Sequence, residues 1–194
     1  MKAALDKNYW DSRYQDGSTG WDLGGVSPAL RAYIDQLENK DLKILIPGGG
    51  NAYELAYLHQ QGFTNSYLID LSPTALANFK KKNPSIDEKF LIEGDYFEHS
   101  GQYDLIIEQT FFCAIDRTLR AKYADQTHQL LKPSGKLVGL LWSDDFGVNA
   151  PPFGGTKEEY LGYFDSLYTI QTMSKSHNSI KPRAGRELFI ILKK

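Results

Sequence analysis

Three short stretches of the sequence carry residues whose types and spacing could bind a ligand. The segment LKILIPGGGNAYELAYL, residues 42–58, is an apolar run that meets a proline and three glycines before helix-forming sequence begins. Glycine lets the backbone approach a ligand closely, and the start of a helix offers N–H groups without partners. Asp70 and Asp95 each follow a later apolar run, and Asp70 comes 22 residues after Gly48. A carboxylate at about that distance can accept hydrogen bonds from ribose hydroxyls.

The spacing of the glycines distinguishes between two nucleotide-like ligands. Dinucleotide sites use G-x-G-x-x-G, but here Gly48 and Gly50 are followed by Tyr53 where the third glycine would fall. The broken fingerprint favours S-adenosyl-L-methionine, which has no pyrophosphate and tolerates a looser loop. In that interpretation Asp95 accepts the exocyclic amine of adenine and Tyr96 packs on the adenine ring. The alternative for both aspartates is a structural role, because aspartate also caps helices and forms turns.

Aromatic residues crowd the N-terminal segment NYWDSRYQDGSTGWDLGGVSPAL, in which Trp10, Tyr14 and Trp21 precede any strong strand signal. One interpretation is a helix that packs on the core, because a spacing of four puts Trp10 and Tyr14 on one helical face. The other is a lid, because aromatic faces attract cations such as a sulfonium and a lid keeps water from a reactive methyl donor. Four glycines between positions 17 and 25 favour a flexible cover, so we expect residues 1–25 to form an aromatic lid.

The elements that must position these residues alternate between strands and helices. Short apolar runs bounded by turn residues predict buried strands at Lys43–Ile46, Ser66–Ile69, Phe90–Ile92, Tyr103–Glu108 and Lys136–Trp142. Helices are expected from Ser27 to about Glu38, over Asn51–Gln60, from Ser72 towards Lys81 and over Thr118–Leu131. This alternation predicts βαβ units and a parallel sheet, with the ligand at the carboxyl ends of its strands. After a long loop, two closing strands are expected at Tyr163–Met173 and Glu187–Leu192.

Length and composition narrow the class of protein. The chain has 194 residues with ordinary hydrophobic and charged fractions of 41% and 24%, so we expect one domain over residues 1–194. A net charge of −2 argues against a nucleic-acid binder held by a broad cationic face. The N-terminus lacks the apolar core of a signal peptide, and no run of about 20 apolar residues exists. We therefore expect a cytoplasmic protein without a membrane span.

Residues that could hold a metal or act as a covalent nucleophile are sparse. The four histidines are scattered and show no ligand spacing, so no metal site is expected. Cys113 is the single cysteine, which excludes an internal disulfide and fits a reducing compartment. It lies in the run TFFCAI with no recognisable base beside it. We interpret Cys113 as a small buried hydrophobe rather than a nucleophile.

Taken in order along the chain, several motifs resemble the thiopurine methyltransferase superfamily, and within it the branch of plant and microbial thiol and halide methyltransferases. They are W…RY…GSTGWDLGGVSPAL, IPGGG, LIDLSPTAL, GDYF, YDLIIEQTFFCAI, LLKPSGKL, PPFGG…EEY and PRAGRE. The resemblance implies an α/β, Rossmann-like class I methyltransferase fold, with a seven-stranded, mostly parallel sheet, an antiparallel last strand and helices on both faces. It also implies S-adenosyl-L-methionine contacts at Trp10, Tyr14, Trp21, Gly48, Asp70, Asp95, Tyr96 and Gln109.

The resemblance further implies methyl transfer to a small soft nucleophile. A thiol or bisulfide is the expected acceptor, with halide, thiocyanate and thiopurine as further candidates, and such nucleophiles need no general base. Phe112, Trp142 and Phe153 would form an apolar acceptor pocket. Arg183 and Arg186 could attract an anionic acceptor or else form surface ion pairs. The plant halide enzymes carry tyrosine at the position of Phe153, so the missing hydroxyl is expected to disfavour halides.

Two other functions remain open at this point. A nicotinamide-dependent oxidoreductase would share the Rossmann-like sheet, but Tyr53 in place of the third glycine and the aromatic N-terminus argue against it. A non-catalytic module that binds S-adenosyl-L-methionine would share the whole cofactor site, because direct methyl transfer needs no signature base.

Overall fold

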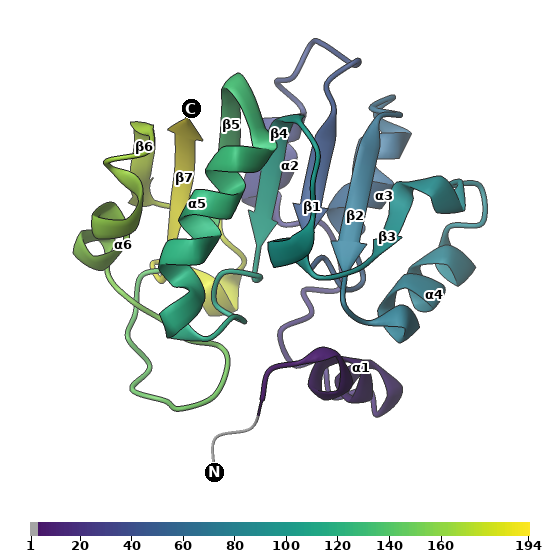
Figure 1. Ribbon diagram of the computed structural model, residues 1–194, viewed down its shortest axis with the longest axis horizontal. Coiled ribbons are helices and arrows are strands. Elements are labelled where there is room, and N and C mark those ends of the chain that lie inside the picture. The colour runs from purple at the N-terminus through teal and green to yellow at the C-terminus, as the bar shows by residue number, and fades with distance from the viewer. Residues whose placement is uncertain (1–3) are drawn as a thin grey trace.

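Seven strands form one sheet in the computed structural model, which describes residues 4–194 (Figure 1). The strand order is β3-β2-β1-β4-β5-β7-β6. The last strand, β7, pairs antiparallel with β5 and β6, whereas the pairs among β1 to β5 are parallel. This topology confirms the expected α/β fold. The strands are β1 (Ile44–Pro47), β2 (Ser66–Asp70), β3 (Leu91–Glu93), β4 (Tyr103–Gln109), β5 (Leu131–Trp142), β6 (Thr169–Lys175) and β7 (Glu187–Lys193).

Local sequence explains where several helices begin. Asp6 accepts a hydrogen bond from the backbone N–H of Tyr9 at the start of α1, and Ser72 does the same for Ala75 at the start of α4. Proline occupies the first position of α2 and of α4. The α-helices are α1 (Lys7–Gln15), α2 (Pro28–Ile34), α3 (Tyr53–Gln60), α4 (Pro73–Lys82), α5 (Arg120–Leu130) and α6 (Lys157–Phe164). Short 3₁₀ turns are η1 (Glu88–Phe90), η2 (Tyr96–Glu98), η3 (Arg117–Leu119) and η4 (Lys181–Arg183). Within residues 4–194, no helix combines the length and the apolar character that a membrane crossing requires.

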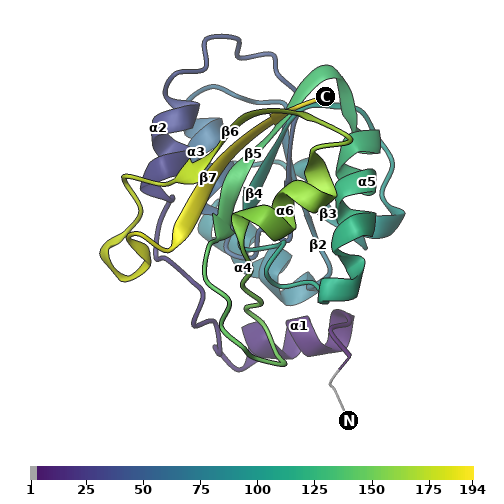
Figure 2. The same ribbon diagram turned by 90° about the vertical axis from the view of Figure 1, so that its left-hand side faces the viewer.

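Buried side chains form two clusters, one on each face of the sheet. Tyr123 of α5 and Phe164 of α6 belong to the cluster that includes Ile106 of β4. Leu55 of α3 belongs to the cluster that includes Ile107, the next residue of β4. Successive residues of a strand face opposite sides, so β4 is covered on both faces (Figure 2). This double burial explains why its sequence is a continuous apolar run.

The C-terminal part differs from the expectation in one element. The sequence predicts a strand over Tyr163–Met173, but the structure has α6 up to Phe164 and β6 only from Thr169. Thr156 accepts a hydrogen bond from the backbone N–H of Glu159 and begins α6, and two glutamates follow in its first turn. Tyr160 and Phe164, four residues apart, are the buried residues of this helix. The helical spacing of two aromatic residues therefore prevailed over their strand propensity.

The N-terminal segment, residues 4–25, lies at the edge of the sheet where the ligand was expected. The carboxyl ends of β1, β2 and β4 point toward α1 in both ribbon views (Figures 1 and 2). Asp11 of α1 accepts hydrogen bonds from the Ser72 hydroxyl at 2.7 Å and from the Thr74 backbone N–H at 2.9 Å. These bonds tie α1 to the start of α4. The lid that the sequence predicts begins in residues 1–3, which lie outside the described residues.

Candidate active site

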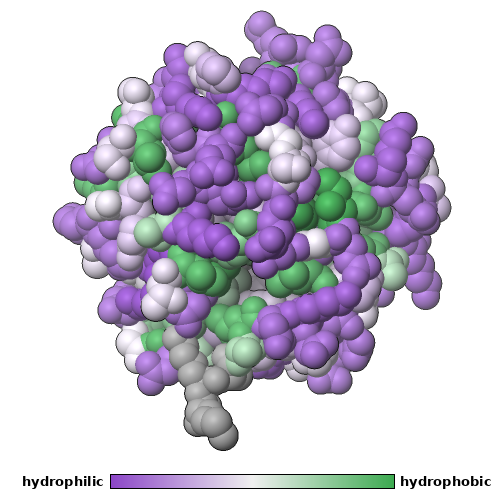
Figure 3. Space-filling model, in the orientation of Figure 1, coloured by the Kyte–Doolittle hydropathy of each residue, from purple (hydrophilic) through white to green (hydrophobic). Residues whose placement is uncertain are grey.

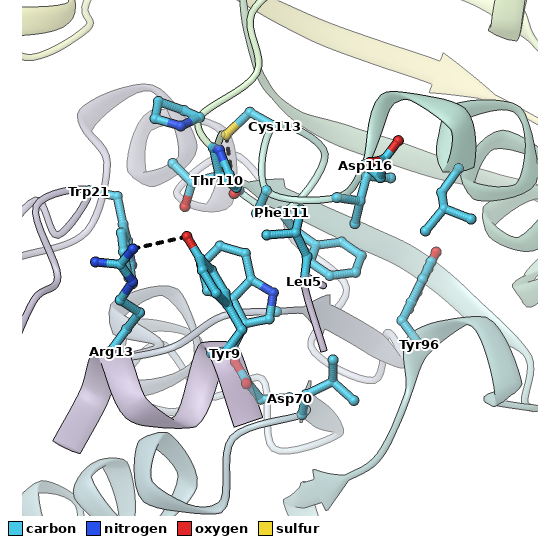
Figure 4. A pocket seen from close by; sticks show the side chains of 18 of the residues that line it. Leu5, Tyr9, Arg13, Trp21, Asp70, Tyr96, Thr110, Phe111, Cys113 and Asp116 are labelled. Atoms are coloured by element: carbon cyan, nitrogen blue, oxygen red, sulfur yellow. Dashed lines mark hydrogen bonds between the residues drawn. The ribbon is translucent and has the colours of Figure 1, made fainter. Parts of the chain in front are cut away.

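A cavity of about 670 Å³ lies between the N-terminal segment and the carboxyl ends of the strands. Its volume is typical of small-molecule sites. In Figure 3 apolar side chains border the hollow above α1, whose outer surface is polar. The N-terminal segment supplies Tyr9, Trp10, Arg13, Tyr14 and Trp21 to the lining. Figure 4 labels Tyr9, Arg13 and Trp21 among them. The strand ends and the loops after them supply Gly48, Asp70, Asp95, Tyr96, Thr110, Phe111, Cys113 and Trp142.

Two glycines after β1 leave space that a side chain would fill. Gly48 and Gly50 have φ angles of +55° and +54°, in the left-handed region that L side chains rarely adopt. A Cβ on Gly48 would lie 2.2 Å from Cδ2 of Phe111, and a Cβ on Gly50 would lie 2.1 Å from the hydroxyl oxygen of Tyr14. Phe111 and Tyr14 both line the cavity. The glycines therefore let the loop, the ring of Phe111 and the N-terminal segment meet closely.

Asp70 at the end of β2 lines the cavity and is only 6% exposed. Its Oδ2 accepts the backbone N–H of Gly50 at 2.9 Å, and its Oδ1 accepts that of Ser72 at 2.9 Å. Burial raises the pKa of this carboxyl, although both hydrogen bonds lower it. A carboxylate oxygen has two lone pairs, so each oxygen retains one acceptor position beyond its backbone bond. Asp70 therefore stabilises the glycine loop and keeps the capacity to accept two ribose hydroxyls.

Asp95 and Tyr96 line the cavity at the next strand end, after β3. Oδ1 of Asp95 accepts the backbone N–H of Phe97 at 2.8 Å, so this aspartate caps η2, as the structural interpretation expected. Tyr96 is 2% exposed, and its hydroxyl is hydrogen-bonded to Oγ1 of Thr127 at 2.7 Å. Because that bond uses the hydroxyl inside the core, Tyr96 offers the cavity its ring rather than its polar end.

Three aromatic residues of the N-terminal segment form one wall of the cavity. The ring centroid of Trp21 lies 5.7 Å from that of Trp10 and 5.9 Å from that of Tyr14, both edge to face. The structural interpretation of this segment correctly expects a helix, α1, but no residue of α1 is buried. The aromatic rings of α1 therefore line a cavity instead of filling the core.

Arg183 in η4 connects the N-terminal segment to the C-terminal part of the chain. Its Nη2 donates to the carbonyl oxygen of Trp21 at 2.8 Å, and its Nη1 lies 3.2 Å from Oε1 of Glu187. Its guanidinium carbon lies 4.9 Å from the ring centroid of Trp142. Arg183 is 7% exposed and lines the cavity, so its ion pair is a buried one. Arg186 instead pairs with Asp144 at 2.5 Å on the surface.

The part of the cavity next to Trp142 and Arg183 is mostly apolar. Cys113, Pro151, Pro152 and Pro182 are lining residues. Pro182 precedes Arg183 in the chain, and the Phe153 backbone N–H donates to the carbonyl oxygen of Cys113, which brings the two prolines before Phe153 close to Cys113. The Cys113 thiol donates to the carbonyl oxygen of Thr110 at 3.2 Å, and burial raises its pKa to about 12. It therefore stays protonated at neutral pH. Among the described lining residues there is no histidine, and residues 4–194 contain no cluster of three or more His, Cys, Asp or Glu that could hold a metal ion.

Comparisons with known proteins show which family this chain belongs to. The model of the thiopurine S-methyltransferase family matches residues 5–189. The chain belongs to the thiopurine S-methyltransferase family. It is 30% identical over 190 residues to the probable thiol methyltransferase 2 of Arabidopsis thaliana, covering 92% of this chain and 81% of that protein. It is 25% identical over 193 residues to the thiopurine S-methyltransferase of Pseudomonas aeruginosa, covering 88% and 87%.

Solved structures share the fold of this methyltransferase. The 1,6-didemethyltoxoflavin-N1-methyltransferase of Burkholderia thailandensis, solved with S-adenosylhomocysteine bound, superposes with a TM-score of 0.76 at 18% identity, covering 97% of this chain and 86% of that one. A TehB-like methyltransferase of Corynebacterium glutamicum gives a TM-score of 0.66, covering 97% and 98%. Family and fold together confirm an enzyme that uses S-adenosyl-L-methionine. The nicotinamide and non-catalytic alternatives find no support.

Three residues predicted for the site do not line the cavity of this methyltransferase. Phe112 packs in the core, where its ring centroid lies 5.0 Å from that of Tyr123. Phe153 is 2% exposed, and the two prolines before it line the cavity in its place. Gln109 is 9% exposed, and its side-chain amide has no hydrogen-bond partner among the described residues. Of the three residues predicted for the acceptor pocket, only Trp142 lines the cavity.

Sequence reasoning missed many of the lining residues, among them Tyr9, Arg13, Phe111 and Cys113. The sequence contains a pattern that could have identified Tyr9 and Arg13. Tyr9 and Arg13 each precede a predicted aromatic contact by one position, so the four-residue spacing that groups Trp10 with Tyr14 also groups Tyr9 with Arg13. The whole inner face of α1 could have been predicted on that ground.

Glu108 lies buried behind the loop that carries Phe111 into the cavity. Its Oε1 accepts the backbone N–H groups of Phe111 at 2.8 Å and Phe112 at 2.9 Å, and its Oε2 accepts the Tyr123 hydroxyl at 2.8 Å. Burial raises the pKa of Glu108 to about 7, although these hydrogen bonds lower it. The carboxyl group therefore takes up a proton in the native protein at a higher pH than in the unfolded chain.

We expect Glu108→Gln to gain stability relative to the wild type as the pH rises. The stabilisation from a protonated native Glu108 is complete below its ordinary pKa of 4.5 and is lost as the pH rises through about 7. Glutamine resembles the protonated carboxyl group at every pH, so the variant does not lose this stabilisation as the pH rises. The full shift corresponds to at most about 3 kcal/mol. Urea unfolding of both proteins at about pH 5 and about pH 8 measures the difference, and an equal difference at both pH values contradicts the expectation.

Proposed function

We propose that this methyltransferase moves the methyl group of S-adenosyl-L-methionine to a small sulfur nucleophile, a thiol or bisulfide. The observation that carries the proposal is the part of the cavity around Trp142, where Cys113 and three prolines line the space and no lining histidine is described. An alcohol acceptor needs a base to remove its proton. A thiol titrates near pH 8.5 and supplies about a few per cent of thiolate at neutral pH unaided. The relatives named as thiol and thiocyanate methyltransferases support the same acceptor class.

The cofactor is assigned to the lining residues that the family resemblance also implies. Asp70 would accept the ribose hydroxyls, and Asp95 with Tyr96 would hold the adenine. The aromatic rings of the N-terminal segment would surround the methionine part, since aromatic faces attract the sulfonium cation. When bound, S-adenosyl-L-methionine supplies a methyl group on an activated leaving group. The residues proposed to contact it are Trp10, Tyr14, Trp21, Gly48, Asp70, Asp95 and Tyr96, all of which line the cavity.

The chain's own contribution to the reaction is to position the two substrates and to exclude water. We assign Trp142 to the acceptor, because it lies beside Arg183 and lines the apolar part of the cavity. The raised pKa of Cys113, about 12, keeps its thiol protonated, so the enzyme does not present a competing thiolate of its own. Residues 4–25 would act as a lid that opens to exchange substrates, and the bonds of Asp11 and of Arg183 would hold it closed.

The choice between sulfur and halide acceptors needs a new basis. The sequence-based argument relies on a hydroxyl missing at Phe153, but this residue lies in the core and not at the cavity. Halide methylation is therefore a second acceptor class, and we include it in the test.

The proposal is tested by incubating the purified protein with S-adenosyl-L-methionine and single acceptors. The panel holds bisulfide, a small thiol, a thiopurine, thiocyanate and iodide, and S-adenosylhomocysteine is measured as the common product. We expect turnover of bisulfide or the thiol to exceed that of iodide. Turnover of iodide alone, or no turnover of any sulfur compound, would overturn the sulfur assignment.

A further inference from the structure

The arginines of this chain differ in whether they have an acidic partner. Five of the six are paired with a carboxylate within 4.0 Å: Arg31 with Asp35, Arg117 with Asp145, Arg120 with Glu159, Arg183 with Glu187 and Arg186 with Asp144. Arg13 is the exception, because no carboxylate among residues 4–194 lies within that distance of it. Arg13 is also a lining residue of the cavity. An unpaired cation therefore faces the place where the substrates bind.

The Arg13 guanidinium is held in place by Tyr9, one helical turn earlier in α1. Nη2 of Arg13 donates to the Tyr9 hydroxyl oxygen at 3.0 Å, and the guanidinium carbon lies 5.0 Å from the Tyr9 ring centroid. Since Tyr9 accepts this bond, its own hydroxyl proton is free to be donated, and no acceptor for it is found among the described residues. Figure 4 shows both side chains pointing from α1 toward Thr110 and Cys113, away from Asp70.

We propose that Arg13 and Tyr9 form an anion-binding site carried by the N-terminal segment. It takes the anionic group that a bound substrate presents at the side of the cavity remote from Asp70. A guanidinium has five N–H donors in a rigid fork and binds anions by charge-assisted hydrogen bonds. The Tyr9 hydroxyl adds one further donor. An ammonium group in the same position would lack the fork, which is why arginine suits this role.

The charges of the cavity agree with this assignment. Among the described lining residues, Asp70, Asp95 and Asp116 carry carboxylates, and Arg13 and Arg183 are the two cations. Arg183 is already paired with Glu187. Arg13 is thus the cation left for a ligand. Because it belongs to α1, an anion bound to it would also fix the N-terminal segment on the substrates. Binding of the anion and closure of the segment would then be one event.

Two groups in this reaction carry the required negative charge. One is the α-carboxylate in the methionine part of the cofactor, and the other is the acceptor thiolate or bisulfide. The second source rests on the proposed function, whereas the first rests only on the cofactor. An experiment can separate them without turnover, because all three tryptophans of the chain line the cavity and report binding by their fluorescence.

The test compares Arg13→Gln, Arg13→Lys and Tyr9→Phe with the wild type. Arg31→Gln is the matched control, because Arg31 lies on α2 outside the cavity lining and pairs with Asp35 on the surface. Three dissociation constants are measured for each protein: S-adenosylhomocysteine, methylthioadenosine, which lacks the amino-acid part, and bisulfide added to the S-adenosylhomocysteine complex. Melting temperatures of the free proteins show whether each variant is folded.

Loss of a charge-assisted hydrogen bond should weaken binding about 10- to 100-fold. If the anion is the cofactor carboxylate, Arg13→Gln weakens the binding of S-adenosylhomocysteine to this extent and leaves the binding of methylthioadenosine unchanged. If the anion is the acceptor, Arg13→Gln weakens only the binding of bisulfide. In either case Arg13→Lys restores part of the affinity, Tyr9→Phe gives a smaller loss and Arg31→Gln gives none. A folded Arg13→Gln that binds all three ligands within twofold of the wild type overturns the proposal, whether or not any sulfur compound is methylated.

Discussion

Replacing Asp70 by asparagine should weaken binding of S-adenosyl-L-methionine on the order of 100-fold or more, since each hydrogen bond to a charged group contributes roughly 1.5–3 kcal/mol. Two causes add together. The variant has one carbonyl oxygen where the carboxylate has two acceptors for ribose hydroxyls. Its amide N–H₂ would also face a backbone donor, either that of Gly50 or that of Ser72, where the aspartate now accepts. The dissociation constant is measured by calorimetry and the KM by steady-state kinetics.

The control for this variant is Asp104→Asn. Asp104 also accepts a backbone N–H, that of Lys43 at 2.8 Å, and it pairs with Lys132, but it lies at the opposite end of β4 from the cavity. We expect this control to leave cofactor affinity unchanged. If Asp70 only held the glycine loop, Asp70→Asn would lower the melting temperature of the free protein while the folded protein bound the cofactor normally. Cofactor affinity within threefold of the wild type would therefore refute the ribose assignment.

The sequence predicts the parts of the fold that are dominated by burial. The central strands β1, β2 and β4 lie under helices on both faces, so their apolar runs stand out between turn residues. Gly48 and Asp70 were located because the ligand site of such a sheet lies at the strand ends, whatever the rest of the chain does. Local sequence was sufficient for these elements, because burial on both faces requires an apolar run that is visible in the sequence itself.

The acceptor pocket could not be predicted in the same way. Which phenylalanine after β4 faces the cavity depends on Thr110, whose φ angle of +63° turns the chain there. A threonine rarely adopts such an angle, so nothing in the run TFFCAI indicates that Phe111 enters the cavity while Phe112 joins the core. The position of the two prolines depends on a contact far along the chain, since the Phe153 backbone N–H donates to the carbonyl oxygen of Cys113 at 2.7 Å.

Arg120 also holds the loop that carries Pro151 and Pro152, which shows that the acceptor pocket depends on contacts in the core. It is fully buried at the start of α5. Its Nη1 lies 2.7 Å from Oε1 of Glu159, and its Nη2 donates to the carbonyl oxygens of Phe153 at 2.9 Å and Gly154 at 3.0 Å. A single buried guanidinium therefore satisfies a carboxylate of α6 and the end of the loop that carries the lining prolines.

Arg120→Met should lower the free energy of unfolding by about 3–5 kcal/mol, the cost of breaking a buried ion pair from one side. For a chain of this size that corresponds to a melting temperature roughly 10 °C lower. Methionine fills much of the space but leaves Glu159 and two carbonyl groups without their donor. Because those carbonyls fix the loop that carries Pro151 and Pro152, the variant should also raise the KM of the acceptor more than that of the cofactor.

Arg117→Met is the matched control, three residues earlier in η3. Arg117 pairs with Asp145 at 2.6 Å, but its side chain is 36% exposed and that of Asp145 is 55% exposed. Exposed ion pairs contribute little to stability, so the midpoint of urea unfolding should hardly move. If Arg120→Met unfolded at the same urea concentration as this control, the predicted contribution of the buried Arg120 bonds to stability would be wrong. The packing of Phe153 would then be sufficient to fix the position of the loop.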